Sequence, residues 1–357
     1  MKIEANGVNY STSFSHAQIE ITGCCNMKCK HCRAINEKPT SISIEKMKLF
    51  LDFATQNSNS NFNLTISGGE PFIHPQFLKI MELVRAYDIN EVVITTNGSL
   101  LNIDNLSHLD KLNFKNLTIQ ISLDSVNSKI HDENRNYAGA FDKAIKALKM
   151  IQNFEHLTSS VRMTINKITM NEIEDMINLL MPLGVKRLGV GGVIPSGAGA
   201  VGSQHLKPQE KKEFLYNLAS LAIKHNGKIE LVTEDPLKCL VEHNPWMSLD
   251  VYKLENNPAV FGGCTAGIDC FNVNTDLCIT PCSVFNEKIL CLNDYNDVEE
   301  VVQAYVTSPL VKRLFSRQFD GKCNNCKHKR ICGGCRATSN FFGGSYFASD
   351  GTCWLDD

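Results

Sequence analysis

The 357-residue sequence lacks several features that would assign it to a common class of protein. It has no apolar run close to the roughly 20 residues that a membrane-spanning helix needs. Its start, MKIEANGVNYSTSF, lacks the apolar stretch of a secretion signal. A net charge of −2 argues against a general nucleic-acid-binding protein, and there is no internal repeat or low-complexity tail. These absences predict a cytoplasmic protein that acts on neither nucleic acid nor membrane.

Cysteine is what the sequence has in excess, with 15 residues in two groups. Four lie at positions 24–32 and ten at positions 264–353, with only Cys239 between them. Cytoplasmic thiols stay reduced and the count is odd, so a disulfide framework is the weakest of three explanations. Zinc and iron–sulfur clusters are the other two. The uneven distribution predicts two separate sites.

The chain from residue 17 to about 190 alternates short β-branched runs with amphipathic segments. It predicts strands at 17–22, 63–67, 91–96, 117–123, 161–166 and 187–190. It predicts helices over 43–55, capped by Ser43, and over 75–87, 103–111, 141–154, 170–183 and 208–226. Six β-then-α units in a row favour an α/β fold, a partial (β/α)6 TIM-like barrel. From about residue 236 we expect an irregular Cys-rich region with short strands and turns at best, held by metal.

Loops of unusual composition follow four of the predicted strands. They are the cysteine loop (23–34), SGGEP (67–71), TNG (96–98) and SLDS (122–125). In barrels of this kind the chemistry sits at the carboxyl ends of the strands. These loops are therefore expected to meet at one mouth.

The cysteine loop contains Cys25-x3-Cys29-x2-Cys32. Structural zinc usually takes four ligands from two short pairs, and no second pair lies nearby. Three thiolates can instead hold three corners of a cubane cluster and leave one iron open for chemistry. Cys24 is a competing ligand, but it would lie across the backbone turn from the other three.

This spacing, in the loop after the first strand, resembles that of the radical SAM superfamily over about residues 15–200. The resemblance implies a [4Fe–4S] cluster on the three cysteines, whose open iron binds S-adenosylmethionine (SAM) for cleavage to a 5′-deoxyadenosyl radical. His31 would lie against the adenine, and Arg135 would bind the SAM carboxylate. The GGEP motif would bind the methionyl amino group, because its glycines let the backbone approach a charged ligand closely. The full set of implied cofactor-binding residues is His31, Gly68, Gly69, Glu70, Pro71, Asn97, Ser122, Asp124, Arg135 and Asn166.

Each of these residues also has a simpler structural explanation when it is taken singly. GGEP could be a turn, Ser122 and Asp124 a helix cap, and Arg135 a surface residue. Their order along the predicted strands is what favours the cofactor site.

The second cysteine group includes two C-x2-C pairs, which in isolation suit a zinc ribbon. After a radical SAM barrel, the arrangement resembles the SPASM extension, which carries two auxiliary [4Fe–4S] clusters. The resemblance implies one cluster on Cys264, Cys270, Cys282 and Cys335, and another on Cys323, Cys326, Cys332 and Cys353. The nearby basic residues, which would offset the cluster charge or simply form a solvated loop, are Lys322, Lys327, Lys329, Arg330 and Arg336.

Two departures from the SPASM pattern make Cys335 the least secure ligand. It follows Cys332 by two intervening residues instead of the usual three, and Leu277 stands where a glycine is common. Cys278 and Cys291 could replace it, whereas Cys24 and Cys239 are expected to have no metal role. The implied domains are 1–232, the barrel, and 233–357, the SPASM domain.

The resemblance implies an enzyme that abstracts hydrogen from a ribosomally synthesised peptide to install a cross-link or other modification. Sulfatase-maturating relatives carry an aspartate base after the equivalent of Cys282, and Ser283 in that place argues against their reaction. Action on a small molecule or tetrapyrrole, or a non-catalytic iron–sulfur or zinc scaffold, would also fit the cysteine pattern. A flavodoxin or ferredoxin would supply electrons. Only 24 residues precede Cys25, so a peptide leader is expected to bind elsewhere or through a separate protein.

Overall fold

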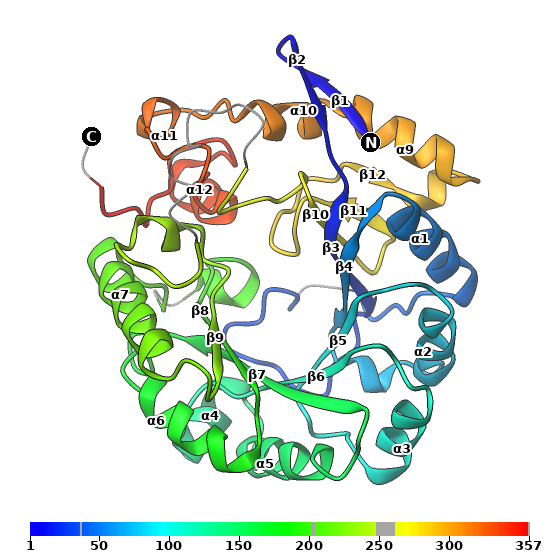
Figure 1. The fold of residues 1–357 in the computed structure, drawn as a ribbon, viewed down its shortest axis with the longest axis vertical. Coiled ribbons are helices and arrows are strands. Elements are labelled where there is room, and N and C mark those ends of the chain that lie inside the picture. The colour runs from blue at the N-terminus through cyan, green and yellow to red at the C-terminus, as the bar shows by residue number, and fades with distance from the viewer. Residues whose placement is uncertain (36–37, 202–203, 248–260, 356–357) are drawn as a thin grey trace.

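A computed structural model describes residues 1–35, 38–201, 204–247 and 261–355. Its centre is a curved sheet in which seven strands pair in parallel and in chain order (Figure 1). They are β3 (Phe14–Thr22), β4 (Ser58–Gly68), β5 (Glu91–Thr96), β6 (Leu117–Ser122), β7 (Leu157–Ile165), β8 (Arg187–Gly192) and β9 (Glu230–Val232). The six predicted strands are confirmed as β3 to β8, and the α/β partial barrel is confirmed with them.

Helices cover the outside of this sheet (Figure 1). They are α1 (Ile44–Gln56), α2 (Phe77–Arg85), α3 (Ile103–Lys111), α4 (Ser128–Arg135), α5 (Ala140–Ile151), α6 (Ile173–Leu180) and α7 (Pro208–Lys224). Ser43 caps α1 as predicted, since its side chain accepts a hydrogen bond from the Lys46 backbone N–H. All but α4 correspond to predicted helices. Short 3-10 turns interrupt the connections: η1 (Pro71–Ile73), η2 (Met181–Leu183), η3 (Gly197–Ala200), η4 (Pro236–Leu240) and η5 (Leu292–Asp294).

Strand β3 shows how the barrel separates its two faces. Ile19 and Ile21 are fully buried in the hydrophobic core. The alternate residues are polar: His16 Nε2 lies 2.9 Å from Thr65 Oγ1, and Gln18 donates to Ser67 Oγ at 2.7 Å. Because successive side chains point to opposite faces and the helices lie outside, the polar row faces the interior of the barrel. The interior of the barrel is thus lined with hydrogen-bonding groups.

The C-terminal third extends the same sheet. Strand β10 (Cys270–Val273) pairs in parallel with β3, and β11 (Cys278–Thr280) and β12 (Leu290–Cys291) follow antiparallel. The helices are α9 (Val298–Thr307), α10 (Pro309–Ser316), α11 (Lys322–Asn325) and α12 (Arg336–Gly343). The expectation of short strands and turns at best is therefore wrong. This part has an apolar core, in which Tyr305 of α9 is fully buried and contacts Phe14 at 5.4 Å between ring centroids.

An N-terminal hairpin was not predicted. Strands β1 (Lys2–Ala5) and β2 (Val8–Ser11) are joined by Asn6 and Gly7, both with positive φ. Asn-Gly is the preferred pair for such a two-residue turn, so the signal was present in the sequence. Tyr10 packs the hairpin against α10, with 5.3 Å between the ring centroids of Tyr10 and Phe315.

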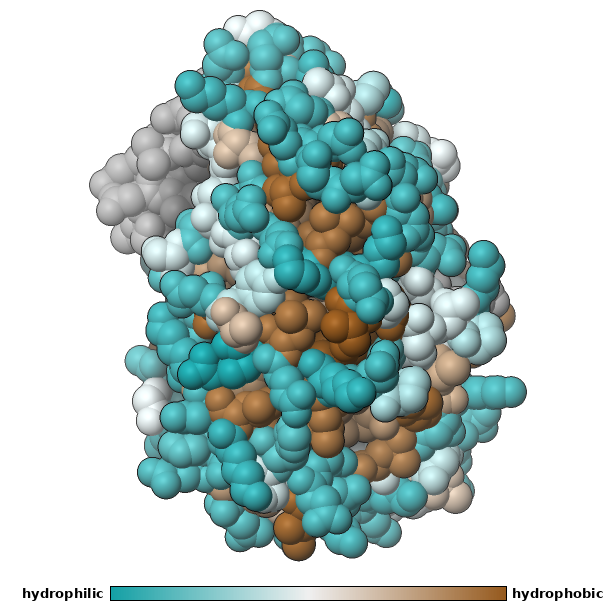
Figure 2. All heavy atoms as spheres, turned by 90° about the vertical axis from the view of Figure 1, so that its right-hand side faces the viewer, coloured by the Kyte–Doolittle hydropathy of each residue, from teal (hydrophilic) through white to brown (hydrophobic). Residues whose placement is uncertain are grey.

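Figure 2 shows the face of the molecule that lies on the right of Figure 1, where hydrophilic residues dominate and apolar residues show between them. Among the described residues no helix combines the length and apolar character needed to cross a membrane. The cytoplasmic location stays a prediction.

Candidate functional site

The cysteine loop leaves the carboxyl end of β3 and carries Cys25, Cys29 and Cys32 on a short run of turns. Cys25 is exposed and the other two are half-buried, and all three lie outside any disulfide. The Cys32 backbone N–H donates to the Cys29 carbonyl at 3.1 Å, which brings these residues round one turn. Burial raises the pKa of the Cys32 thiol. A bound cation would therefore be needed to hold the Cys32 sulfur as a thiolate, the form in which cysteine binds metal.

The SGGEP segment at the end of β4 packs directly on the cysteine loop. The Gly69 N–H donates to the Thr22 carbonyl at 2.7 Å, and the Glu70 N–H to the Cys24 carbonyl at 2.8 Å. A Cβ atom at Gly68 or Gly69 would clash with those same carbonyl oxygens. The sequence predicted a close approach of these glycines to a charged ligand. The close approach that the structure shows is to the end of β3 and the cysteine loop, and the approach to a ligand stays a prediction.

Glu70 is fully buried and joins three segments. Its Oε1 accepts from Thr96 Oγ1 at 2.7 Å and its Oε2 accepts from the Asn97 N–H at 2.8 Å. Asn97 in turn donates through its side chain to Asn26 Oδ1 in the cysteine loop at 2.9 Å. Burial raises the pKa of Glu70 to about 7 in spite of these donors. Glu70 and Asn97 thus tie the ends of β4 and β5 to the cysteine loop.

Arg135 and Asp124 form a buried ion pair beside the cysteines, and the half-buried His31 lies next to it. Arg135 Nε lies 2.8 Å from Asp124 Oδ2, and its Nη1 donates to Cys29 Sγ at 3.8 Å. His31 Nε2 lies 3.8 Å from the same carboxylate oxygen. Burial opposes ionisation of Asp124, but Arg135 and His31 hold its pKa below the ordinary value. Burial also lowers the pKa of Arg135. The neighbouring Asp124 and Cys29 more than offset this effect, so the pKa of Arg135 is raised overall.

These contacts rule out the simpler explanations of Arg135 and Asp124. Arg135 is 8% exposed and Asp124 is fully buried, so Arg135 is not a surface residue. Asp124 is not a helix cap, since its Oδ1 accepts from the Thr164 N–H at the end of β7, and Asn127 caps α4. Helix α4 was missed because its sequence, SKIHDENR, has one apolar residue and no amphipathic pattern.

The remaining predicted cofactor-binding residues lie at the same end of the barrel. Ser122 is the last residue of β6, and Pro71 opens the 3-10 turn after Glu70. Asn166 directly follows β7 and is buried. Its Oδ1 accepts from the backbone N–H groups of Ile168 and Thr169, so this oxygen shapes the local turn. All the predicted loops therefore lie at the strand ends where the barrel rule placed them.

Two contributions to this end of the barrel escaped the sequence reasoning. The first is η3, whose Ala198 N–H donates to the Cys32 carbonyl at 2.8 Å. Gly197 has positive φ, and a Cβ there would clash with the carbonyl of Arg33. Nothing in the Gly/Ser-rich composition of residues 191–204 signalled this contact, and residues 202–203 of that stretch lie outside the described residues.

The second is an ion pair between Arg33 and Glu20. Arg33 Nη1 donates to Glu20 Oε1 at 2.8 Å and to the Ser283 carbonyl at 3.0 Å. Ser283 follows Cys282, so this arginine links the cysteine loop to the second cysteine group. Glu20 Oε2 is buried and has no hydrogen-bond partner among the described residues. The only sequence signal was the alternation of polar residues along β3.

The four cysteines of the first predicted auxiliary site come from separate elements and converge. Cys264 precedes β10, Cys270 begins it, Cys282 follows β11 and Cys335 caps α12. They lie close enough to influence one another's ionisation. Burial is the largest cause that raises the pKa of Cys282. The neighbouring Cys264 raises it further, and Cys335 adds a smaller increase. The structure thus brings Cys335 to this group.

Cys323, Cys326, Cys332 and Cys353 line one pocket in the C-terminal third. Apolar residues, among them Leu237 and Phe319, complete its wall. Cys353 lines this pocket with the other three cysteines, and Cys335 does not. The two C-x2-C pairs, Cys323/Cys326 and Cys332/Cys335, therefore do not form one tetrahedral metal site. Burial raises the pKa of Cys353 to about 11, which again leaves a neutral thiol unless metal replaces the proton.

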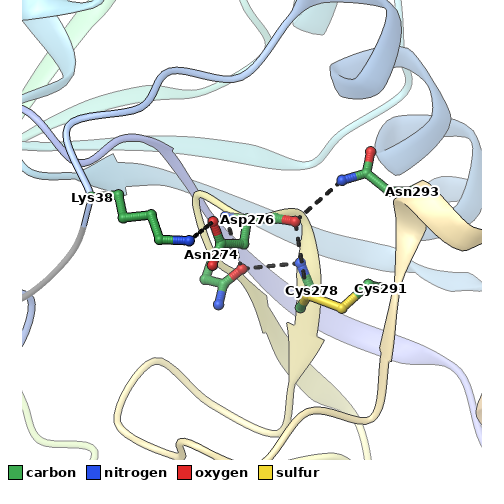
Figure 3. The surroundings of a disulfide bond; sticks show 6 residues. All are labelled: Lys38, Asn274, Asp276, Cys278, Cys291 and Asn293. Atoms are coloured by element: carbon green, nitrogen blue, oxygen red, sulfur yellow. Dashed lines mark hydrogen bonds and ion pairs between the residues drawn. A yellow bond between two sulfur atoms is a disulfide. The ribbon is translucent and has the colours of Figure 1, made fainter.

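The predicted substitutes for Cys335 are wrong, because Cys278 and Cys291 form a disulfide (Figure 3). The antiparallel register of β11 and β12 places the two residues opposite each other. Lys38, from the segment that follows the cysteine loop, lies 3.7 Å from Asp276 in the turn before Cys278 (Figure 3). The sequence could not reveal this bond, since nothing in the spacing singles out this pair among fifteen cysteines.

No three His, Cys, Asp or Glu side chains of the described residues converge tightly enough for a single metal ion. A cubane distributes its ligands over several irons and needs a wider arrangement of thiols. Cys25, Cys29 and Cys32 offer three such thiols, beside a buried guanidinium, two carboxylates and an imidazole. That set is complementary to an open cluster with a bound amino-acid nucleotide.

The radical SAM superfamily model matches residues 19–180, which run from β3 through α6. This part of the chain is a radical SAM domain, and the protein is an enzyme that uses S-adenosylmethionine and an iron–sulfur cluster.

Relatives and solved structures extend the likeness over nearly the whole chain. The antilisterial bacteriocin subtilosin biosynthesis protein AlbA of Bacillus subtilis is 28% identical over 341 residues, 93% of this chain and 69% of AlbA. An AdoMet-dependent heme synthase of Oleidesulfovibrio alaskensis is 23% identical over 353 residues, which are 94% of this chain and 85% of the synthase. The crystal structure of Streptococcus suis SuiB bound to its precursor peptide SuiA has a TM-score of 0.78 at 18% identity, covering 97% of this chain and 77% of SuiB. That last likeness shows the fold.

Proposed function

We propose that this radical SAM enzyme is a peptide maturase, which abstracts hydrogen from a ribosomally synthesised peptide to install a cross-link or another modification. The observation that carries the radical chemistry is Arg135, buried between the Asp124 carboxylate and the Cys29 thiol. The peptide class is supported by AlbA, which is named for the biosynthesis of a bacteriocin, and by SuiB, crystallised with a precursor peptide.

When bound, the cluster and SAM supply a 5′-deoxyadenosyl radical. Cys25, Cys29 and Cys32 would hold the cluster, and Arg135 would offer its guanidinium to the SAM carboxylate, a pairing that suits a planar fork. Glu70 and Asn97 hold the SGGEP and TNG segments against the cysteine loop. His31 orients toward Asp124 beside them. The chain's own task is to position the nucleotide and keep water from it.

The C-terminal third, proposed as the SPASM domain 233–357 after a barrel domain 1–232, would hold two auxiliary [4Fe–4S] clusters. The two converging sets of four cysteines support this. Arg317 is 1% exposed and donates to the Cys264 carbonyl at 2.7 Å, and Arg336 is 2% exposed. A solvated basic loop does not describe Arg336, which donates to the carbonyls of Tyr346 and Ala348. Buried cations beside thiolates offset cluster charge.

The test is an anaerobic reconstitution with iron, sulfide, SAM, reductant and candidate precursor peptides encoded next to the gene. We expect a peptide of changed mass and, with deuterated peptide, transfer of deuterium to 5′-deoxyadenosine. A Cys25→Ala, Cys29→Ala, Cys32→Ala variant is expected to yield neither. If only a tetrapyrrole or small molecule is converted, the peptide proposal is wrong while the radical SAM chemistry stands.

The heme synthase relative favours a second candidate, action on a tetrapyrrole. The same assay distinguishes the two, because a porphyrin precursor would then change mass and the peptides would not. A flavodoxin or ferredoxin as electron donor, and a separate leader-binding protein, complete the proposal. Both are tested by adding the purified candidate to the assay.

A further inference from the structure

Asp350 places a buried carboxylate between the two sets of cysteines in the C-terminal third. It belongs to the segment that follows α12 and is 1% exposed. It also lines the pocket that Cys323, Cys326, Cys332 and Cys353 share. A carboxylate is costly to bury unless hydrogen-bond donors surround it, so the donors around Asp350 indicate its role.

One oxygen of this carboxylate holds Cys335. The Cys335 backbone N–H donates to Asp350 Oδ2 at 2.7 Å. Cys335 is the N-cap residue of α12, and it follows Gly333 and Gly334, which both have positive φ. Thr338 Oγ1, in the first turn of the helix, lies 2.8 Å from Asp350 Oδ1 and 2.8 Å from the Cys335 carbonyl oxygen. The carboxylate therefore fixes the backbone of the ligand proposed for the first auxiliary cluster.

The other oxygen holds the turn that carries Cys353. Asp350 Oδ1 accepts from the Thr352 backbone N–H at 2.8 Å and from Thr352 Oγ1 at 2.7 Å. The backbone carbonyl of Asp350 accepts from the Cys353 N–H at 3.1 Å. These three bonds close a tight turn immediately before a ligand proposed for the second auxiliary cluster.

We propose that Asp350 is a positioning residue shared by the two auxiliary clusters, with Oδ2 fixing Cys335 of the first and Oδ1 fixing the turn at Cys353 of the second. The inference rests on the proposed function, since it requires both clusters. A carboxylate only accepts hydrogen bonds, so it suits a place that backbone N–H groups approach from both sides. An amide of the same shape would turn its NH2 group toward one of those N–H groups.

Replacing Asp350 with asparagine separates the two contacts. Asparagine can keep the local bond from its side-chain oxygen to the N–H two residues further along the chain, here that of Thr352. Its NH2 group then faces the Cys335 N–H, and two donors cannot bond to each other. Asp350→Asn should therefore loosen Cys335 and preserve the turn at Cys353, whereas Asp350→Ala should loosen both.

The experiment uses the full chain with the three cysteines of the cysteine loop changed to alanine, so that only the auxiliary clusters are loaded. This parent, Asp350→Asn, Asp350→Ala and the control Asp297→Asn are reconstituted anaerobically with iron and sulfide. Asp297 caps α9 by accepting the Glu300 N–H at 2.9 Å, so the control makes the same chemical change at an ordinary helix cap. Release of iron to an excess of chelator is followed by absorbance, and the reduced clusters are recorded by electron paramagnetic resonance.

We expect half of the iron in Asp350→Asn to leave about tenfold faster than in the parent, in keeping with the loss of one hydrogen bond to a charged group. The other half should leave at the parent's rate, and only one of the two cluster spectra should change. All of the iron should leave faster in Asp350→Ala. Parent-like release in both Asp350 variants, or the same acceleration in Asp297→Asn, would overturn the proposal. Equal acceleration of all the iron in Asp350→Asn would also overturn it, because a general loss of structure would act on both clusters.

A second background, with Cys264→Ala and Cys270→Ala added, assigns the fast half of the iron. Asp350→Asn should release iron from this background at the background's own rate, and faster release would overturn the assignment of Oδ2 to the first cluster. If the added changes remove no iron from the parent, the first auxiliary cluster is absent and the proposed auxiliary clusters fail together with this inference. If they remove the iron of one cluster while Asp350→Asn behaves like the parent, only the role of Asp350 fails.

Discussion

At the scale of single residues, the charges beside the cysteine loop are arranged around Arg135. Its guanidinium contacts a carboxylate and a thiol at once, in a place from which solvent is almost excluded. Neither contact was visible in the sequence, where HDENRN reads as a polar surface segment. The interactions depend on α4, which brings the arginine back toward the barrel.

Replacing Arg135 with alanine is expected to abolish measurable SAM binding and to destabilise the protein by roughly 3–5 kcal/mol. The reason is that Asp124 would remain a buried charge without its partner. Calorimetric titration of SAM into the reconstituted enzyme and urea unfolding measure the two effects. Arg135→Lys keeps the charge but not the fork, so it should recover part of the stability and little of the SAM affinity. Wild-type SAM affinity in Arg135→Ala would contradict the assigned role.

The buried carboxyl group of Glu70 predicts that the stability of the folded protein changes with pH in one direction. Burial raises its pKa from 4.5 to about 7 in the folded protein, so between these values the folded state binds more protons than the unfolded state. Stability should therefore fall as the pH rises from about 4.5 to about 7, by on the order of 3 kcal/mol at most, and then level off. Urea unfolding of the SAM-free protein across this range measures the slope.

Glu70→Gln is the matched control for that measurement, because it cannot ionise and retains an oxygen acceptor. The difference in stability between wild type and variant should change across the window and be constant above it. Parallel pH profiles for the two proteins would show that Glu70 is ionised like an exposed carboxylate.

At the scale of elements, the end of β4 is positioned by contact with a loop and not by a ligand alone. Two backbone hydrogen bonds and two closely packed glycines join SGGEP to the end of β3 and to the cysteine loop. The strands themselves followed from their β-branched runs, and α1 followed from its cap and apolar face. Helix α4 did not, since it is stabilised by the Asn127 cap and by buried polar side chains.

Gly69→Ala is expected to reduce both the iron of the first cluster and the rate of 5′-deoxyadenosine formation at least tenfold. Its Cβ would meet the Cys24 carbonyl, which is backbone and cannot rotate away, so the cysteine loop must shift. Gly189→Ala is the control: it makes the same change on β8, where the nearest atoms are at ordinary contact distances of 3.5–3.7 Å. Iron analysis and SAM-cleavage assays compare them. Equal behaviour of the two variants would contradict the packing explanation.

At the scale of the whole molecule, the C-terminal third is part of the barrel's sheet. Strand β10 pairs with β3, and Phe271 packs on Phe14 with 4.4 Å between ring centroids. Arg33 joins the cysteine loop to Ser283, and Lys211 of α7 pairs with Asp235 at the start of η4. The proposed domain boundary at 232/233 therefore separates the cysteine loop from the second cysteine group. It nevertheless cuts through a hydrophobic core that both parts of the chain share.

Removing residues 233–357 is expected to leave a barrel fragment that unfolds without a cooperative transition, because the edge of β3 and the face of Phe14 lose their cover. Thermal unfolding followed by circular dichroism, beside the full chain without metal, measures this. The converse finding, a cooperative fragment with a melting temperature within a few degrees of the full chain, would show that the barrel is an independent unit.

Six parallel strands, most of the helices around them and the loop order could be predicted from the sequence, because β-branched runs, apolar spacing and helix caps are local signals. It also located the three-cysteine loop. The sequence left open which distant side chains meet, and the tertiary structure decided it. Arg135 reaches Cys29, Cys353 and not Cys335 joins the pocket, and Cys278 closes on Cys291. Such contacts depend on strand register and on the packing of separate segments, which no local pattern encodes.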